Sequence, residues 1–343
     1  MTEVLDREER VIKMLPREYT EYLEEQTLCE YAFLSKNSKG RAVPSPECDI
    51  RTEFQRDRDK IIHSNAFRRL KHKTQVFVSP TGDHYRTRLT HTLEVQQIAR
   101  TIARALRLNE DLTEAIAMGH DLGHTPFGHA GERALNSCCK HGFHHYEQGI
   151  RVVDYIENDG RGLNLTAEVK DGILKHTNQI ADTKEGYVVR FADVIAYINH
   201  DIDDAIRGGI IRESDIPDEI TDILGHSKSE RITTLVRSMV DHGAKEIGMS
   251  PEIDKAYKAL HEFMFDSVYH NIKCKSEEGK AQEMLIKLYD YFCENLTKIP
   301  PLYQRLADRF DKEMAVCDYI AGMSDSFAVD VFSEIFIPKG WKY

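Results

Sequence analysis

The sequence of 343 residues lacks several features that mark membrane, secreted and repeat proteins. No apolar run approaches the ~20 residues that a membrane-spanning helix needs, and the N-terminal segment MTEVLDREERVIK is too charged for a signal peptide. The seven cysteines form no CxxC pair, and we interpret them as reduced thiols. No segment repeats or is low in complexity. These absences predict a soluble cytoplasmic protein that does not bind membranes.

An excess of positive charge is also missing. The net charge of −11 argues against a general nucleic-acid coat, which needs Lys and Arg to neutralise phosphates. One basic segment, residues 51–73, nevertheless stands out. It is either a solvated helix face, with Asp57 or Asp59 paired to a base one turn away, or a basic wall around a polyphosphate pocket. The charge run alone favours the first interpretation.

The residues that are present indicate an all-α protein. The composition of 41% hydrophobic and 30% charged residues suits a chain that buries a sizeable core, and the apolar periodicity is helical. No linker is long enough to separate independent domains. We expect one helical domain with an N-terminal arm over residues 1–45, a central core over 46–206, and a C-terminal helical region over 207–343 packed on that core.

Two consecutive segments predict helices that each carry a histidine in the buried stripe. Over residues 91–106, apolar side chains recur at steps of three and four and place His91 at the N-terminal end of the stripe. In the next segment, Asn109 is a suitable N-cap and Gly123 a suitable end, and His120 closes the apolar stripe.

A third predicted helix carries acidic residues among apolar ones. The segment YVVRFADVIAYINHDIDDAIRGG reads as a long helix that ends at Gly208 and Gly209. Four polar positions share one of its faces at steps of four and three: Asp193, Tyr197, Asp201 and Asp204. A carboxylate amid so much apolar surface is costly unless it binds something.

Together, the three segments present residues of the metal-ligand type: His91, His120 with Asp121, and Asp193. Neighbouring residues on a helix point about 100° apart, so His120 and Asp121 converge on one ion only beside a helix end. Two imidazoles and two carboxylates suit Mn²⁺, Fe²⁺, Co²⁺, Ni²⁺, Zn²⁺ or Mg²⁺. Open coordination positions would admit water and a substrate oxygen, as metal-assisted hydrolysis requires. A single such histidine is more often a core residue, so the coincidence of three features carries the prediction.

Four segments together resemble the deoxyguanosine triphosphate triphosphohydrolases of the HD superfamily of phosphohydrolases. They are RDRDKIIHSNAFRRLKHKTQVF, RTRLTHTLEVQQIAR, GHDLGHTPFGHAGE and VVRFADVIAYINHDIDDAI. The similarity runs from about residue 40 to 209, and a weaker similarity is found at CDYIAGMSDSFAVDVFSEIFIPKGW. The His-Asp pair is weakly specific, whereas FRRLKHKTQV with RTRLTHTLEVQQ is highly specific for this branch.

The resemblance implies an all-α, HD-type metal-binding core and a reaction. A deoxynucleoside triphosphate would be hydrolysed to deoxynucleoside and inorganic triphosphate by water that attacks the α-phosphorus. The implied metal ligands are His91, His120, Asp121 and Asp193, with Mn²⁺ or Mg²⁺ as the expected ion. The resemblance also implies a homo-oligomer. It further suggests that a second nucleotide binds as an effector and activates the protein.

Further roles follow from the same resemblance. His129 and Glu132 would act beside the metal, with the carboxylate orienting an imidazole that transfers a proton to or from the attacking water or the departing 5′-oxygen. Arg88 would neutralise phosphate charge. His124 is either a phosphate contact or a helix-end histidine that bonds backbone carbonyls.

The sugar subsite is implied in the same way. Gln75 and Asp201 match positions that hold the 3′-hydroxyl, and Tyr197 matches the aromatic residue under the deoxyribose, where a ring leaves no room for a 2′-hydroxyl. On spacing alone, Tyr197 would be a core residue. No matched motif identifies the preferred base, so the substrate is dGTP or several dNTPs.

Some features depart from the family pattern or stay open. Ser326 and Phe327 stand where the family often has an Arg-aromatic pair, and neither His144 nor His145 receives a role. Alternative functions are HD-type hydrolysis of nucleoside monophosphates or cyclic nucleotides, and a non-catalytic regulator that binds nucleotide or single-stranded nucleic acid. Two amphipathic C-terminal segments, IDKAYKALHEFMFDSVY and AQEMLIKLYDYFCENL, are either oligomer interfaces or, more safely, intramolecular core.

Overall fold

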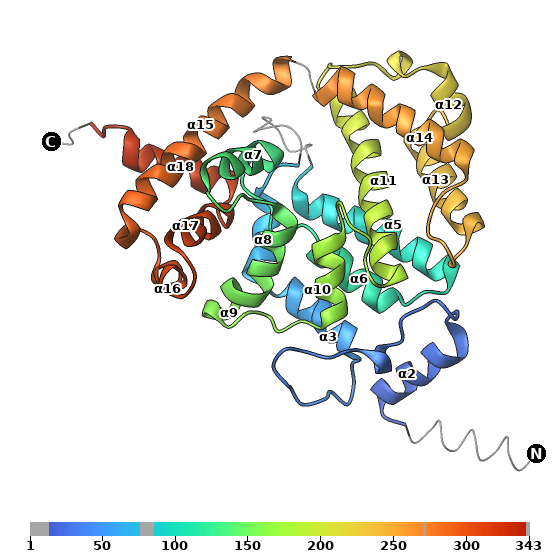
Figure 1. The fold of residues 1–343 in the computed structure, drawn as a ribbon. Helices are drawn as coiled ribbons and strands as arrows, with labels where there is room; N and C mark the ends of the chain where they lie inside the picture. Colours follow the sequence, from blue (N-terminus) through green and yellow to red (C-terminus); the bar gives the residue numbers. More distant parts are fainter. Residues whose placement is uncertain (1–13, 76–85, 270–271, 341–343) are drawn as a thin grey trace, which may run out of the picture.

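The computed structural model describes residues 14–75, 86–269 and 272–340, and the described chain is helical (Figure 1). Within these residues there is no sheet, and β-type pairing is limited to the isolated bridges Arg41–Thr166 and Thr74–Thr87. The predicted all-α fold is confirmed. Residues 1–13 of the predicted arm and the predicted loop SPTGDH lie outside the described residues. No described helix is long and apolar enough to cross a bilayer.

The helices of the first half are α2 Pro16–Thr27, α3 Glu53–Ile62, α4 Asn65–Arg69, α5 Arg88–Leu106, α6 Glu110–Gly119, α7 Gly128–Cys138, α8 His145–Arg151, α9 Glu157–Gly160, α10 Ala167–Lys175 and α11 Lys184–Arg207. Those of the second half are α12 Asp218–Leu224, α13 Lys228–His242, α14 Pro251–Met264, α15 Ile272–Glu294, α16 Pro301–Arg309, α17 Lys312–Ala321 and α18 Asp325–Phe336. A π-helical turn, η5 Phe265–Tyr269, follows α14.

The apolar side chains form two separate clusters. The central cluster takes buried residues from α3, α5, α6, α10 and α11 and continues into α12 to α14. The C-terminal cluster takes residues from α7, α15, α17 and α18, including Leu135, Leu285 and Val316. Figure 1 shows α7 beside α15 and α17, away from α11. In both clusters, helices that precede residue 206 pack against helices that follow it, so the expected boundary near residue 206 does not divide the core.

Local signals account for most helix ends. Asn109 caps α6, because its side chain accepts from the backbone N–H groups of Asp111 at 3.1 Å and Leu112 at 3.2 Å. Gly208 directly follows α11, as predicted. Both predictions are confirmed.

The predicted end of α6 at Gly123 is wrong, because the helix ends at Gly119. His120 and Asp121 thus lie in the turn after the helix. Gly123 has a different reason to be glycine: a Cβ there would lie 2.1 Å from the carbonyl oxygen of His145, so α8 packs directly against the turn.

The two amphipathic C-terminal segments bury their stripes inside the chain. Ala256, Leu260 and Met264 belong to the central cluster, and Leu285 and Phe292 belong to the C-terminal cluster. The interpretation of these stripes as intramolecular core is confirmed. A homo-oligomer remains a prediction, and these buried faces are not available to make it.

Candidate functional site

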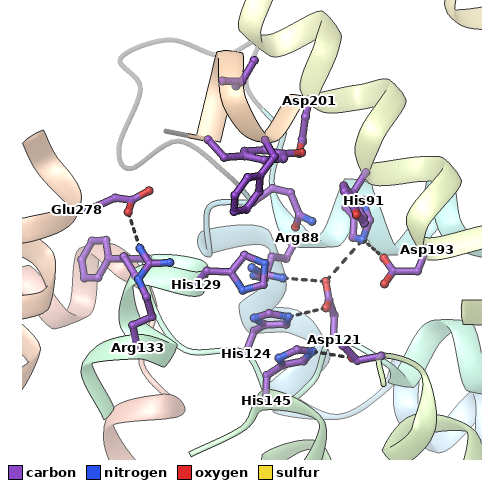
Figure 2. Close-up of a pocket in the computed structure, with 18 of the residues that line it drawn as sticks. Arg88, His91, Asp121, His124, His129, Arg133, His145, Asp193, Asp201 and Glu278 are labelled. Atoms are coloured by element: carbon purple, nitrogen blue, oxygen red, sulfur yellow. Dashed lines mark hydrogen bonds and ion pairs between the residues drawn. The ribbon is translucent and has the colours of Figure 1, made fainter. Parts of the chain in front are cut away.

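A cavity of about 760 Å³ collects most of the predicted site residues (Figure 2). Nine of them line it: Gln75, Arg88, His91, Asp121, His124, His129, Asp193, Tyr197 and Asp201. The other two, His120 and Glu132, lie directly behind this wall and contact lining residues. The far wall comes from η5 and α15, which the sequence did not connect to the site.

The four residues predicted as metal ligands converge at one end of the cavity. The Nε2 atom of His91 lies 3.0 Å from Oδ1 of Asp193 and 4.0 Å from Oδ2 of Asp121. The Nε2 atom of His120 lies 3.7 Å from Oδ1 of Asp193 and 3.5 Å from Oδ1 of Asp121. Ligands held about 2.1 Å from one ion lie roughly 3.0–3.4 Å apart in octahedral or tetrahedral geometry. The separations here, 3.0–4.0 Å, begin in this range and exceed it. The ligand atoms of His91, His120 and Asp193 lie within 4.8 Å of one another, so these three residues could hold a cation, whereas Asp121 does not belong to that group.

His120 is oriented as a ligand would be. Its Nδ1 atom lies 2.6 Å from the carbonyl oxygen of Ala117, which fixes that nitrogen as the donor. Its Nε2 atom is buried and, within the described residues, has no hydrogen-bond partner. A buried nitrogen lone pair without a partner is costly. The donor set and this orphaned atom fit a bound metal ion.

The carboxylates of this cluster are held in their ionised forms. Burial raises the pKa of Asp193, but the hydrogen bond with His91 and the nearby ring of His120 outweigh it and bring the pKa to about 2. Burial also raises the pKa of Asp121, and His120, Arg88 and His124 together bring it well below its usual range. Ionised carboxylates are what a divalent cation needs.

Arg88 adds a positive charge next to the metal-ligand cluster. It is buried, and its Nη1 donates to Oδ2 of Asp121 at 3.1 Å. Its Nε and Nη2 atoms are buried and lack partners among the described residues. Because Arg88 lines the cavity, these nitrogens can donate to an anion that enters it.

A second polar group lies beside the first, on α7 and α8. Oε2 of Glu132 lies 3.4 Å from Nδ1 of His129, so the predicted pair does meet. Glu132 contacts His145 more closely: the backbone N–H and the Nδ1 atom of His145 both lie 3.0 Å from its carboxylate. Burial raises the pKa of Glu132, but the hydrogen bonds with His129 and His145 outweigh it, and the net shift is strongly downward.

His145 is the main site residue that the sequence left without a role. Its ring stacks on that of His124 with centroids 3.9 Å apart, and its Nε2 lies 3.3 Å from Nε2 of His176. The Nδ1 of His176 bonds the carbonyl oxygen of Ile173, and burial, with His120 nearby, lowers the pKa of His176 to about 4. Neutral His176 can therefore accept at Nε2 from His145, whose Nε2 also lies 3.3 Å from the hydroxyl of Thr177.

This hydrogen bonding separates the two polar groups chemically. His124, Glu132 and His145 are close enough to hold a metal ion, but both ring nitrogens of His145 are already engaged. The group is better suited to moving protons. The doublet of His144 and His145 drew notice in the sequence, yet only His145 is buried, whereas His144 is exposed. Nothing in the spacing linked either of them, or His176, to Glu132.

In Figure 2, Asp201 of the predicted sugar subsite lies above His91 and Asp193, whereas His124 and His145 lie below them. Tyr197 and Asp201 follow Asp193 along α11, and all three line the cavity together with Gln75. Burial raises the pKa of Asp201 to about 7, and its carboxylate accepts a hydrogen bond from the hydroxyl of Tyr269, a residue that the sequence did not single out.

Not every residue of the same face reaches the cavity. Asp204 shares the face in the sequence but instead pairs with Arg86 at 3.1 Å. The basic segment also stays outside, because none of its residues from 51 to 73 lines the cavity. Arg51 pairs with Asp59 on the surface, and Arg58 pairs with the buried Glu114. The basic-wall interpretation is wrong, and the solvated-face interpretation holds for Arg51 and its neighbours but not for Lys73, which is buried.

An ion pair spans the rim of the cavity. Arg133 on α7 pairs with Glu278 on α15, and both residues line the cavity (Figure 2). The side chain of Arg133 is 54% exposed, so the rim is open to solvent. Neither residue carried a signal in the sequence, because the pair joins helices that are far apart along the chain.

Comparisons with known proteins agree with this arrangement. The HD domain family matches residues 88–198, and the phosphohydrolase-associated domain matches residues 247–334. A deoxyguanosinetriphosphate triphosphohydrolase-like protein of Caldanaerobacter subterraneus is 58% identical over 96% of this chain and 98% of its own. Proteins of the same name from Clostridium tetani and Clostridium perfringens are 46% and 50% identical, over 95% and 94% of this chain and 98% of each relative.

One solved structure, a hypothetical protein from Aquifex aeolicus, matches with 17% identity over 82% of this chain and 68% of that chain. Its TM-score of 0.48 is too low to support an inference.

Proposed function

This chain belongs to the deoxyguanosinetriphosphate triphosphohydrolase-like family of HD-domain proteins, and on that premise we propose that it hydrolyses deoxynucleoside triphosphates to deoxynucleoside and inorganic triphosphate. One observation carries the proposal: the metal-ligand cluster and Arg88, two of whose buried nitrogens have no partner among the described residues, line the same cavity. A site for a cation and a site for an anion therefore adjoin, as metal-assisted hydrolysis of a phosphate ester requires.

His91, His120, Asp121 and Asp193 would hold the metal ion, for which we propose Mn²⁺ or Mg²⁺ on the family resemblance, although nitrogen and oxygen donors also accept Fe²⁺, Co²⁺, Ni²⁺ or Zn²⁺. A divalent cation supplies a Lewis acid for an oxygen of the α-phosphate. Arg88 donates to neighbouring phosphate oxygens and balances their charge. Because Arg88 also bonds Asp121, the position of the phosphate is tied to that of the metal ligands.

Glu132, His145 and His129 would move the proton. Glu132 holds the ring of His145 through Nδ1 and its backbone through N–H. The more exposed His129, also in contact with Glu132, is free to turn toward the 5′-oxygen or the water. An imidazole positioned by a carboxylate is an effective general acid or base.

Asp201 and Gln75 would bind the 3′-hydroxyl, and Tyr197 would lie against C2′ of the sugar. The Oε1 atom of Gln75 is buried without a partner among the described residues, so it can accept from a hydroxyl. Protonated Asp201 can donate and ionised Asp201 can accept. The ring of Tyr197 discriminates against ribonucleotides by occupying the space of a 2′-hydroxyl.

The test is an end-point assay on metal-stripped protein with each dNTP, GTP, dGMP and a cyclic nucleotide. Mn²⁺ or Mg²⁺ is added back, and nucleoside, diphosphate and triphosphate products are resolved. We expect deoxynucleoside with intact triphosphate, and in H₂¹⁸O we expect the label in triphosphate, because water attacks phosphorus. His120→Ala should abolish product, whereas Asp222→Asn at an exposed position of α12 should not.

The other outcomes identify the competing functions. Release of phosphate from dGMP or opening of the cyclic nucleotide, with dNTPs intact, would assign the site to monophosphates or cyclic nucleotides. Nucleotide binding without turnover under either metal would make the protein a regulator. Salt-sensitive binding of single-stranded DNA without triphosphate release would point to the nucleic-acid version of that regulator.

A further inference from the structure

The motif GMSDSFA near the C-terminus has no part in the proposed chemistry, yet its aspartate is buried next to the active-site loop. Asp325 begins α18 and is 7% exposed. One carboxylate oxygen accepts from the backbone N–H of Phe127 at 2.9 Å, and the other accepts from that of Thr74 at 3.0 Å. The side chain thus joins two segments that are distant in sequence and that both border the cavity.

Lys73 makes a matching connection from the other side. It is 3% exposed, and burial lowers its pKa well below the usual range. Its amino group donates to the carbonyl oxygens of His124 and of Ala321, the latter at 2.7 Å. The carbonyl oxygen of Lys73 accepts from the N–H of Arg88 at 3.0 Å, at the start of α5. Lysine is buried so fully only where its amino group is satisfied by hydrogen bonds.

The loop held between them has a backbone that needs support. Phe127 has φ +59° and Gly128 has φ +54°, and a non-glycine residue in the left-handed region is strained unless its surroundings fix it. The loop runs from His124 to Gly128 and leads directly into α7, which carries His129 and Glu132. Its geometry therefore sets where the proton-transfer residues lie relative to Arg88.

We propose that Lys73 and Asp325 form a clamp of two positioning residues, which hold the loop 124–128 against the C-terminal helices and thereby align His124 and His129 with the metal cluster. Neither side chain is among the cavity-lining residues, so both act through the loop. The clamp makes catalysis depend on the junction of α17 and α18. The kinetic test of the clamp rests on the proposed function, whereas the structural test, amide hydrogen exchange of the loop, does not.

The experiment uses the full-length variants Lys73→Met and Asp325→Asn. Methionine keeps the length of the side chain and removes its donors, whereas asparagine places its amide NH₂ group against one of the two backbone N–H groups. Matched controls are Lys71→Met and Asp330→Asn, which make the same changes at exposed positions. The milder Asp325→Ser is included in case Asp325→Asn does not fold. Readouts are kcat, KM, bound Mn²⁺, Tm and amide hydrogen exchange of residues 124–131.

For the clamp variants we expect kcat to fall about 10–100-fold, since misplacement by about 1 Å costs up to that much. KM should change less than about 3-fold and bound Mn²⁺ should stay constant, because neither Lys73 nor Asp325 bonds a metal-ligand residue. Exchange of the loop amides should be faster, and both controls should resemble wild type. The double variant should lose little more kcat than the worse single one, because both residues hold one loop.

Three results would overturn the clamp: unchanged loop exchange in folded variants, a lower Tm with kcat unchanged in the folded protein, or losses that multiply in the double variant. If wild type hydrolyses no nucleotide, the proposed function fails. Loop exchange with Mn²⁺ bound then still decides for or against the clamp.

Discussion

The two walls of the cavity are built in different ways. The metal-ligand wall, from α5, α11 and the turn after α6, belongs to the central cluster, and its His91, His120 and Asp121 are almost completely buried. The proton-transfer wall comes from α7 and α8, and α7 packs into the C-terminal cluster. On that wall the His129 side chain is 68% exposed. Burial disfavours the ionised carboxylates at both walls, and their neighbours keep them ionised: His91, His120, Arg88 and His124 at the first wall, and His129 and His145 at the second.

The difference shows how one fold supplies both a rigid cation site and a reachable proton donor. A buried ligand set is pre-organised, since its side chains cannot take up other positions. A proton-transfer residue has to reach substrate and water. The structure meets both needs by placing the exposed His129 on α7, which packs on the C-terminal helices, while α8 packs on α10 and on the turn after α6 and brings His145 to the metal-ligand wall.

The largest effect should come from breaking the buried wall. Asp193→Asn should lower kcat on the order of 10³-fold and release bound Mn²⁺, because it removes a ligand and charge that no neighbour replaces. Bound metal is measured by elemental analysis beside kcat. Asp222→Asn, at a side chain 72% exposed, is the control. A variant that keeps both metal and activity would contradict the ligand assignment.

A smaller effect should come from the other wall. Glu132→Gln should lower kcat about 100-fold while bound Mn²⁺ stays constant, since the amide can no longer accept from both histidines. This separation of kcat from metal content is the sharpest test of the comparison. Glu219→Gln, on the exposed side of α12, serves as control. Loss of metal from Glu132→Gln would show that the two walls are not independent.

A still smaller effect is expected at the sugar subsite. Tyr197→Ala should reduce the preference for dGTP over GTP by about 10-fold, as the space for a 2′-hydroxyl opens. The ratio of the two kcat/KM values is measured against wild type. Tyr187→Ala, also on α11 but not among the cavity-lining residues, is the control. An unchanged ratio would mean that Tyr197 is only a packing residue.

The last effect concerns stability within the central cluster, away from the cavity. Burial raises the pKa of Glu185 from 4.5 to about 7. The folded state therefore binds more protons than the unfolded chain between these values, so the free energy of unfolding falls as pH rises through them. Glu185→Gln should remove this fall. Relative to wild type, its free energy of unfolding should be higher at pH 8 than at pH 4 by roughly 2–3 kcal/mol.

Urea unfolding of both proteins across pH 4–8 checks this prediction, with kcat expected to stay unchanged. The same slope in wild type and Glu185→Gln would show that another group is responsible. A loss of kcat would mean that this part of the central cluster reaches the site after all.

Much of the metal-ligand wall was accessible from the sequence. Helical periodicity placed His91 in a buried stripe and Asp193 on one face of α11, and both are where it predicts. The residue types, two imidazoles and two carboxylates, also indicated a site for a divalent cation. The end of α6 was misjudged, because Gly123 serves the close approach of α8 rather than the helix end.

The proton-transfer wall and its supports were much less accessible. His129 and Glu132 were found through resemblance and their spacing of three residues. The partner that Glu132 holds most closely, His145, follows a turn, and His176 comes from another helix. Tyr269 beside Asp201, and Asp325 beside Phe127, are still more distant.

By itself, the sequence determined the helical class, the buried faces, the residue types of a cation site and the family resemblance. These depend on periodicity and spacing within single segments, where the geometry of the helix relates neighbours directly. Only the tertiary structure decided that α7 packs on the C-terminal helices, that His145 completes the group around Glu132, and that Lys73 and Asp325 meet the same loop. Such contacts depend on how separate helices pack, and no local period encodes that.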